Sequence, residues 1–312
     1  MPQTASNLYI TQTREVFYCN VKIKIPAAFS DTLLDKAFAV FEAIDLTYNS
    51  YQPGSHFSEI NKHAGHWVEV DDNVIKMLKT LIDVARYTGG AFDITAMPLI
   101  KLWGFYNNGT KKIPSMAEIQ EAIGKTGYQN IEIKDNLVKI QKGQEIITGS
   151  FIKSFAVDKT IQLLKNEGIT DCIINAGGST IYAINNSIHT HWGVNIPSII
   201  TEGQPIKIML GNECFSLSAR AHNYIEIKGK HYGHIINAAT GHPSANQQCG
   251  VIADNAFIAD VLSTALFSSS PENFNVLVEK LSCNFTFKAF LADDNGNIFN
   301  RGFKFKDSYT IQ

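Results

Sequence analysis

The order of helical and strand-like segments constrains the fold of this chain more than any other feature. Helical periodicity with cap signals marks residues 30–49, 71–90 and 151–169, and strand-like runs occupy 16–26 and 171–184. These segments follow one another without the regular strand–helix–strand alternation that builds a parallel sheet. We therefore predict an α+β fold, with a largely antiparallel central sheet and flanking helices.

Shorter segments fit the same class of fold. Ser115 followed by Glu118 has the spacing of a capping box and predicts a helix that begins there. Residues 255–269 indicate another helix, and the run from 191 to 232 is strand-like but broken by Gly and Pro. We see no repeat, low-complexity segment or linker, so we expect one domain over residues 1–312. If that domain has two lobes, the ligand cleft lies between them.

Composition argues against several classes of protein. The formal net charge is −2 without a long run of one sign, so we expect no nucleic-acid partner and no basic membrane-binding face. No apolar stretch is long enough to predict a transmembrane segment. The N-terminus is too polar for a secretory signal. The sequence as written therefore indicates the cytoplasm, and the periplasm if a leader has been removed.

One carboxylate stands out in residues 88–105, TGGAFDITAMPLIKLWGF. Asp93 follows two glycines and is surrounded by apolar and aromatic side chains. The glycines permit a tight helix exit and a close approach of the backbone to a bulky ligand. Alternatively, the segment is a helix end followed by an aromatic loop, in which Asp93 caps a neighbouring element.

Two other segments are compatible with a phosphate ligand. NAGGST at 175–180 is a glycine turn whose N–H groups could face a phosphate, although a plain hairpin turn is the commoner explanation. Asp260 and Thr264 are four residues apart in a predicted helix and therefore share a face. Two hard oxygen ligands suit Mg²⁺ or Ca²⁺, and a local hydrogen bond is the alternative. His234 lies in a strand-like run, where a lone histidine is more often structural than catalytic.

Six segments, taken in order, resemble those of the FAD:protein FMN transferase family, also called the ApbE family. They are YNSYQPGSHFSEIN, TGGAFDITAMPLIKLWGF, GSFIKSFAVDK, NAGG, YGHIINAATGHP and IADVLSTALF, and they span residues 48–267. The resemblance implies a flavin-transferase fold of the α+β class. It also implies a reaction in which the FAD pyrophosphate is cleaved, FMN passes to a threonine of an acceptor protein, and AMP leaves.

The same resemblance implies roles for individual residues. His234 would take the threonine proton, and Asp93 would hydrogen-bond the nucleotide or orient the groups that do. Asp260, Thr264 and a position near Ser150 would hold Mg²⁺, with Ca²⁺ as the alternative ion. The remaining predicted contacts to FAD are Phe17, Tyr51, Ala91, Phe92, Lys153, Gly177, Gly178 and Ile236.

Departures from the family pattern keep other functions open. Residues 17–19 stand where the family has Met-Gly-Thr, and Ile147 stands where it has an aspartate, so one polar contact to FAD is missing. Arg220 replaces an acidic or neutral residue and is expected to pair with phosphate or with Asp93, or to face solvent. If these changes close the cleft, the chain is a divergent FAD- or nucleotide-binding protein. A further alternative is a metal-dependent FAD pyrophosphatase.

Overall fold

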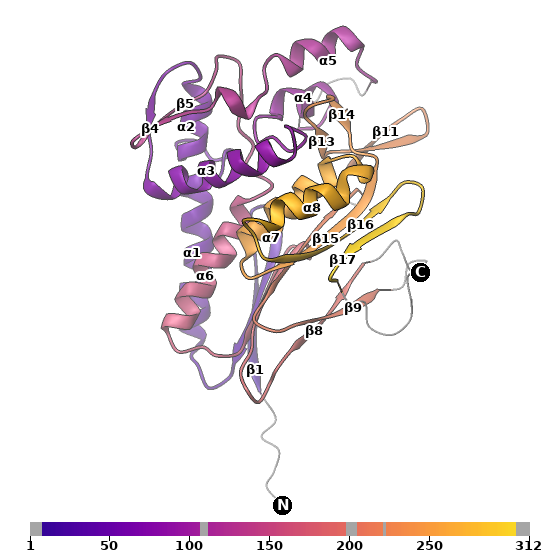
Figure 1. Cartoon of the computed structure of the whole chain (residues 1–312). Coiled ribbons are helices and arrows are strands. Elements are labelled where there is room, and N and C mark those ends of the chain that lie inside the picture. The colour runs from indigo at the N-terminus through magenta and orange to yellow at the C-terminus, as the bar shows by residue number, and fades with distance from the viewer. Residues whose placement is uncertain (1–7, 107–111, 198–204, 221–222, 304–312) are drawn as a thin grey trace, which may run out of the picture.

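An eight-stranded antiparallel sheet forms the centre of the fold (Figure 1). The computed structural model describes residues 8–106, 112–197, 205–220 and 223–303. Every neighbouring pair in the sheet is antiparallel, which confirms the predicted class. In spatial order the strands are β1 (Tyr9–Val16), β2 (Cys19–Pro26), β6 (Cys172–Ala176), β7 (Thr180–Ile184), β10 (Cys214–Ala219), β15 (Asn246–Ala253), β16 (Phe287–Asp293) and β17 (Ile298–Arg301).

Smaller sheets extend this centre. The ribbon of β8 (Trp192–Ile196) and β9 (Ile206–Leu210) buries alternate residues, so it presents one apolar face. That face packs on Ile181, Phe215 and Phe290 of the central sheet. The others are β3 (Val68–Glu69) with β5 (Leu137–Lys139) and β4 (Glu132–Lys134), β11 (Tyr224–Ile227) with β12 (Lys230–Gly233), and β13 (Ile236–Asn237) with β14 (His242–Pro243).

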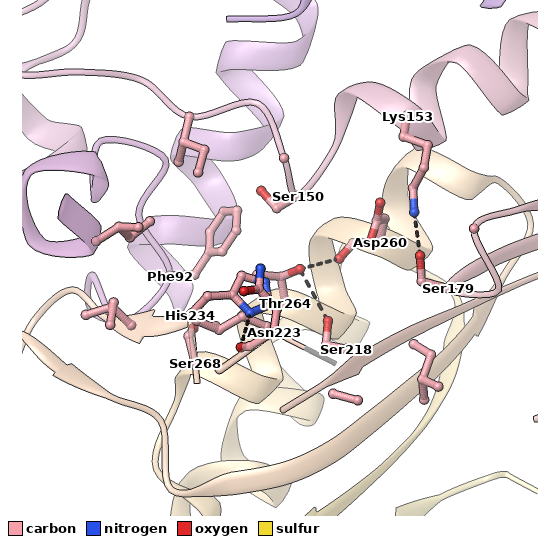
Figure 2. A pocket seen from close by; sticks show the side chains of 18 of the residues that line it. Phe92, Ser150, Lys153, Ser179, Ser218, Asn223, His234, Asp260, Thr264 and Ser268 are labelled. Atoms are coloured by element: carbon pink, nitrogen blue, oxygen red, sulfur yellow. Dashed lines mark hydrogen bonds between the residues drawn. The ribbon is translucent and has the colours of Figure 1, made fainter. Parts of the chain in front are cut away.

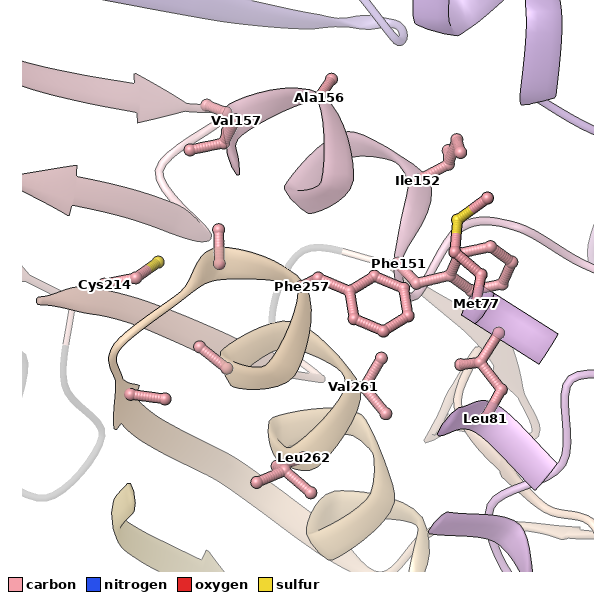
Figure 3. Close-up of a cluster of buried hydrophobic side chains, with 14 of the residues drawn as sticks. Met77, Leu81, Phe151, Ile152, Ala156, Val157, Cys214, Phe257, Val261 and Leu262 are labelled. Atoms are coloured by element: carbon pink, nitrogen blue, oxygen red, sulfur yellow. The ribbon is translucent and has the colours of Figure 1, made fainter. Parts of the chain in front are cut away.

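Helices bury the opposite face of the sheet in the main apolar core, where α7 lies against β10 and β15. Figure 3 shows Phe257 of α7 pointing toward Phe151, at 6.1 Å between ring centroids, with Met77 beside them. The helices are α1 (Asp31–Tyr48), α2 (His56–Lys62), α3 (Asp72–Tyr87), α4 (Met97–Leu102), α5 (Met116–Ile123), α6 (Ile152–Asn166), α7 (Ala256–Ser268) and α8 (Phe274–Ser282), with 3₁₀ turns η1 (Tyr128–Asn130) and η2 (Pro271–Asn273). Among the described residues, no helix combines the length and apolar character that a bilayer crossing requires.

Cap residues fix the helix starts that the sequence predicts. Ser30 accepts a hydrogen bond from the N–H of Thr32 at the start of α1, and Asp71 accepts one from Val74 at the start of α3. At α5, Ser115 and Glu118 form the predicted capping box. Each cap satisfies a backbone donor that would otherwise have no partner in the first turn.

Two local predictions are wrong. Residues 16–26 are not one strand, because the chain reverses at Phe17 and Tyr18 between β1 and β2. Both residues are left-handed, with φ of 55° and 56°, a conformation that short hairpin turns require and that glycine or asparagine usually supplies. The aromatic loop that we gave as the alternative interpretation of residues 88–105 contains the helix α4, which we did not predict because its six residues are too few to show helical periodicity.

Candidate functional site

A cavity of about 580 Å³ lies between the loop before α4, the start of α6, the β6–β7 turn, β10 and α7. Its volume is within the range of small-molecule sites. Segments far apart in the sequence meet in it, and Figure 2 shows several of their side chains converging. The predicted site residues that line it are Phe92, Asp93, Ser150, Lys153, Gly177, Gly178, His234, Ile236, Asp260 and Thr264.

The α7 side of the cavity carries the predicted metal ligands. Asp260 is only 7% exposed, and its Oδ1 accepts a hydrogen bond from Ser216 Oγ at 3.0 Å. The buried Oδ2 has no hydrogen-bond partner among the described residues. Thr264 Oγ1 donates to the Asp260 main-chain oxygen at 3.0 Å, which leaves its lone pairs available. Burial raises the pKa of Asp260, and the positive charge of Lys153 opposes that rise.

An orphaned, buried carboxylate oxygen is costly unless something binds it. Together with the Thr264 hydroxyl it forms a pair of hard oxygen donors, the type that Mg²⁺ and Ca²⁺ prefer. The described residues contain no group of three or more His, Cys, Asp or Glu suited to a metal ion. The residues present therefore fit an ion whose shell is completed by neutral oxygens and by the ligand.

Lys153 lies in the first turn of α6 and holds the glycine turn. Its Nζ donates to Ser179 Oγ and to the Ala176 carbonyl, the latter at 3.3 Å. The N–H groups of Gly177 and Gly178 already donate, to the Asn20 carbonyl at 3.0 Å and to Asn175 Oδ1 at 2.8 Å. Of the two interpretations of this segment, the geometry matches the plain hairpin turn, and the ammonium of Lys153 is the positive group at this end.

The ring of His234 packs edge-on against Phe105, at 6.3 Å between ring centroids. Its Nδ1 is 3.2 Å from the Asn223 carbonyl oxygen. A carbonyl only accepts, so Nδ1 carries the hydrogen and Nε2 keeps a free lone pair. Among the described residues, none is hydrogen-bonded to Nε2. Burial lowers the pKa of His234, so the ring is neutral near pH 7.

Asp93 is engaged by the protein itself. Oδ1 accepts from the Thr95 N–H at 2.8 Å and from Thr95 Oγ1 at 2.7 Å, and Oδ2 accepts from the Tyr128 N–H at 2.6 Å. Burial raises its pKa, and these three hydrogen bonds oppose the rise. Of the two interpretations of the sequence, the geometry matches the cap. Asp93 ties the loop to η1 and so orients the cavity wall that includes Phe92.

Three predicted FAD contacts lie outside the lining of this cavity, as far as the described residues define it. Phe17 packs edge-on against Phe41 at 6.4 Å between ring centroids. The ring of Tyr51 lies 5.9 Å from that of Tyr106, which does line the cavity. The Ala91 carbonyl accepts from the Ala238 N–H at 3.0 Å.

The departures from the family pattern can now be placed. Tyr18 is 77% exposed at the hairpin turn and is not among the lining residues, so it does not fill this described cavity. Ile147 does line the cavity and extends an apolar wall with Ile94 and Ile236. Arg220 forms an ion pair with Asp294 instead of pairing with Asp93 or facing solvent. Its Nη2 lies 2.7 Å from Asp294 Oδ1, and its Nη1 donates to Asp294 Oδ2 at 2.9 Å, so its charge is already paired without a phosphate.

Sequence reasoning missed several polar groups at the site. Asn195, Ser218 and Asn223 line the cavity. Ser216 does not line it but donates a hydrogen bond to Asp260 Oδ1. One signal was available for the two serines: they alternate along a strand-like run and therefore share a face. Nothing local indicated that this face meets α7.

Comparison with known proteins identifies the family. The sequence model of the ApbE family matches residues 17–287. This chain belongs to the ApbE family. The resemblance drawn from the six segments is therefore confirmed. The FAD:protein FMN transferase of Buchnera aphidicola subsp. Schizaphis graminum is 28% identical over 228 residues, covering 70% of this chain and 67% of that protein. The FAD:protein FMN transferase of Escherichia coli K12 is 26% identical over 268 residues, covering 82% of this chain and 76% of that protein.

Solved structures of ApbE proteins share the fold. The ApbE protein of Thermotoga maritima superimposes with a TM-score of 0.85 at 25% identity, covering 95% of this chain and 97% of that chain. The apo form of the Pseudomonas stutzeri flavinyl transferase ApbE gives 0.81 at 24% identity, covering 95% of each chain. The ApbE fold therefore extends over nearly the whole of this sequence.

Proposed function

We propose that this member of the ApbE family transfers FMN from FAD to a threonine of an acceptor protein, with Mg²⁺ held by Asp260 and Thr264. One observation carries the proposal: the same cavity holds an unpartnered buried carboxylate oxygen and a histidine with a free Nε2. A cation ligand and a proton acceptor are the two groups that such a transfer needs. The names of its relatives support the same reaction.

The proposed transfer is a single displacement at phosphorus. The threonine Oγ forms a bond to the phosphorus of the FMN phosphate, the bond from that phosphorus to the bridging oxygen breaks, and AMP leaves with that oxygen. Nε2 of His234 receives the threonine proton, because the ring is neutral and Nδ1–H is held by Asn223. Lys153 places a positive charge at the opposite end of the cavity, beside Asp260.

Asp260 Oδ2 and Thr264 Oγ1 would hold the ion, with a carbonyl near Ser150 as the third protein ligand. When bound, Mg²⁺ offsets the negative charge that develops on the pyrophosphate oxygens. Ca²⁺ takes the same kind of oxygen ligand, so the site chemistry alone does not choose between the two ions.

The apolar wall would receive a ring system of the substrate. Phe92, Ile94, Ile147 and Ile236 line it. Ile147 presents an apolar side chain where the family has an aspartate. At this position, burial of a ring of the substrate would therefore contribute to the binding free energy in place of a polar contact. Asp93 acts behind the wall as an orienting group rather than as a proton carrier, since its oxygens are already bonded.

The test is an FAD titration with and without Mg²⁺, followed by mass spectrometry of the products and of a threonine-bearing acceptor protein. Mg²⁺-dependent AMP release with FMN attached to the acceptor is the expected result. AMP with free FMN in the presence of that acceptor would favour the pyrophosphatase. Saturable binding without AMP would favour a flavin-holding protein, and the absence of FAD binding would overturn the proposal.

A further inference from the structure

Two serines of β10 face the two proposed metal ligands of α7. Ser216 and Ser218 are two residues apart on the strand and therefore point to one face, about 6.7 Å apart along it. Asp260 and Thr264 are four residues apart in α7, which is about 6.0 Å along the helix axis. Because the two spacings nearly match, Ser216 Oγ lies 3.0 Å from Asp260 Oδ1 and Ser218 Oγ lies 3.4 Å from Thr264 Oγ1 (Figure 2 shows the second pair).

The Ser216 hydroxyl has one hydrogen to donate, and the structure indicates which oxygen accepts it. Ser216 Oγ lies within reach of two oxygens, Asp260 Oδ1 at 3.0 Å and the Ser179 carbonyl at 3.2 Å. Both oxygens are acceptors when Asp260 is ionised. The Ser179 carbonyl already accepts the N–H of Leu217 at 2.8 Å. That carbonyl still has a second lone pair, but the ionised carboxylate is the stronger acceptor and the closer one. The hydroxyl hydrogen therefore goes to Oδ1, and Oδ2 is the oxygen that remains for a cation.

The position of Ser216 is rigid. Its side chain is fully buried, and its backbone pairs with Thr180 of β7 on one side and Val251 of β15 on the other. A strand in the middle of the sheet thus carries the hydroxyl that holds Oδ1. With one oxygen held, rotation of the Asp260 carboxylate is restricted before any ion arrives.

We propose that Ser216 is a positioning residue that orients Asp260 for the cation. This inference rests on the proposed function, because it needs Asp260 to be a metal ligand. It assigns the orienting contact to a side chain that lies behind Asp260 and is not among the residues that line the cavity.

The test measures binding of Mg²⁺ alone to the full chain by calorimetry and by the Mg²⁺-dependent rise in melting temperature. Ser216→Ala should weaken Mg²⁺ binding by about 10- to 100-fold, the usual effect of losing such a supporting hydrogen bond. Ser216→Cys keeps the unbranched shape of the side chain with a larger atom and a weaker donor, and its affinity should fall between those of the wild type and Ser216→Ala. With Mg²⁺ varied at saturating FAD, the KM for Mg²⁺ should rise more than kcat falls.

Ser263→Ala is the matched control. Its hydroxyl is buried at the same strand–helix contact, but it meets Ser218 Oγ at 2.9 Å and the main-chain oxygen of Asp260 at 3.0 Å rather than the carboxylate. We expect this variant to lose stability and to keep its Mg²⁺ affinity. Equal weakening in both variants would show general loosening of the contact and overturn the inference.

Asp260→Asn separates this inference from the proposed function. If the wild type binds Mg²⁺, Asp260→Asn abolishes that binding and Ser216→Ala leaves it unchanged, the positioning role is wrong while the metal site stands. If Asp260→Asn binds Mg²⁺ as tightly as the wild type, both the metal site and the positioning role are overturned.

Discussion

The environment of His234 defines what that residue can do. A carbonyl holds Nδ1–H, and burial favours the neutral ring. His234→Ala should therefore slow FMN transfer by about 10²- to 10⁴-fold, the usual contribution of a general base, and leave FAD affinity nearly unchanged. Stopped assays of AMP release and fluorescence titration of FAD measure the two quantities separately. A parallel loss of affinity and rate would make His234 a binding group instead.

The same residue predicts a pH dependence. Since burial lowers the pKa of His234 from its ordinary value of 6.5, the neutral form persists below that pH. Protonated His234 cannot accept a proton, so the transfer rate should fall at acid pH, with the midpoint of the fall below pH 6.5. The rate at saturating FAD and Mg²⁺ checks this profile, with His234→Ala as the control that should lose the acid limb. A midpoint at or above pH 6.5 would contradict the assignment.

At the scale of elements, the β6–β7 turn offers a matched pair of glycines. Both are left-handed, with φ of 68° at Gly177 and 74° at Gly178. A Cβ at Gly177 would lie 3.1 Å from Cβ and Sγ of Cys19, whereas a Cβ at Gly178 would meet nothing within 4 Å. Either change to alanine should cost about 1 kcal/mol of unfolding free energy from backbone strain. Gly177→Ala should lose more in urea unfolding, and equal losses would show that the Cys19 contact relaxes freely.

The start of α7 supplies a second prediction at this scale. Asp158 of α6 accepts from the N–H groups of Ala256 and Phe257 at 2.7 and 2.9 Å, and burial raises its pKa to about 6. A raised carboxyl pKa means that the folded state holds the proton more tightly. The resulting stabilisation is complete below about pH 3.8 and is lost as the pH rises through about 6.

Asp158→Asn should therefore flatten the curve of unfolding free energy against pH between 4 and 7. Denaturant titrations of the two proteins at each pH measure the difference, in which other titrating groups cancel. Parallel curves for wild type and variant would show that Asp158 does not titrate in this window.

On the scale of the whole molecule, the cavity joins segments from Phe92 to Ser268, so a ligand bound there links much of the fold. FAD with Mg²⁺ at about 100 times its dissociation constant should add about 2.7 kcal/mol to the unfolding free energy. Differential scanning fluorimetry should show a higher melting temperature with both ligands than with FAD alone. In Asp260→Asn the Mg²⁺-dependent part should vanish. The same shift with and without Mg²⁺ in the wild type would contradict the proposed site.

Local chemistry predicted the parts of the fold that local contacts fix. Ser30, Asp71 and Ser115 cap helices where the sequence places them, because a cap acts within one turn. The hairpin turn at Phe17 and Tyr18 escaped prediction, since aromatic side chains do not specify a left-handed backbone. The order of the strands was also beyond reach, because it depends on pairings between distant segments.

The same division holds for the site. Helical spacing was enough to place Asp260 and Thr264 on one face of α7. The contact from Ser216 arises from the packing of α7 on β10, and the use of the Gly177 N–H by Asn20 arises from the pairing of β2 with β6. No local pattern encodes either long-range contact. The assignment of roles came from the ordered series of family segments. The prediction that Tyr51 contacts FAD remains untested.

The pairing of β2 with β6 has a consequence for the order in which the chain acquires its structure. Residues 27–171 lie between these neighbouring strands, whereas β1–β2, β6–β7 and β16–β17 are hairpins closed by short turns. Closing a long loop costs more entropy than closing a hairpin, so we expect β2 and β6 to join late. Cys19 and Gly177 meet at that seam, at the edge of the cavity. During synthesis, the ligand site therefore stays incomplete until α7, which carries Asp260 and Thr264, has left the ribosome and β2 has paired with β6.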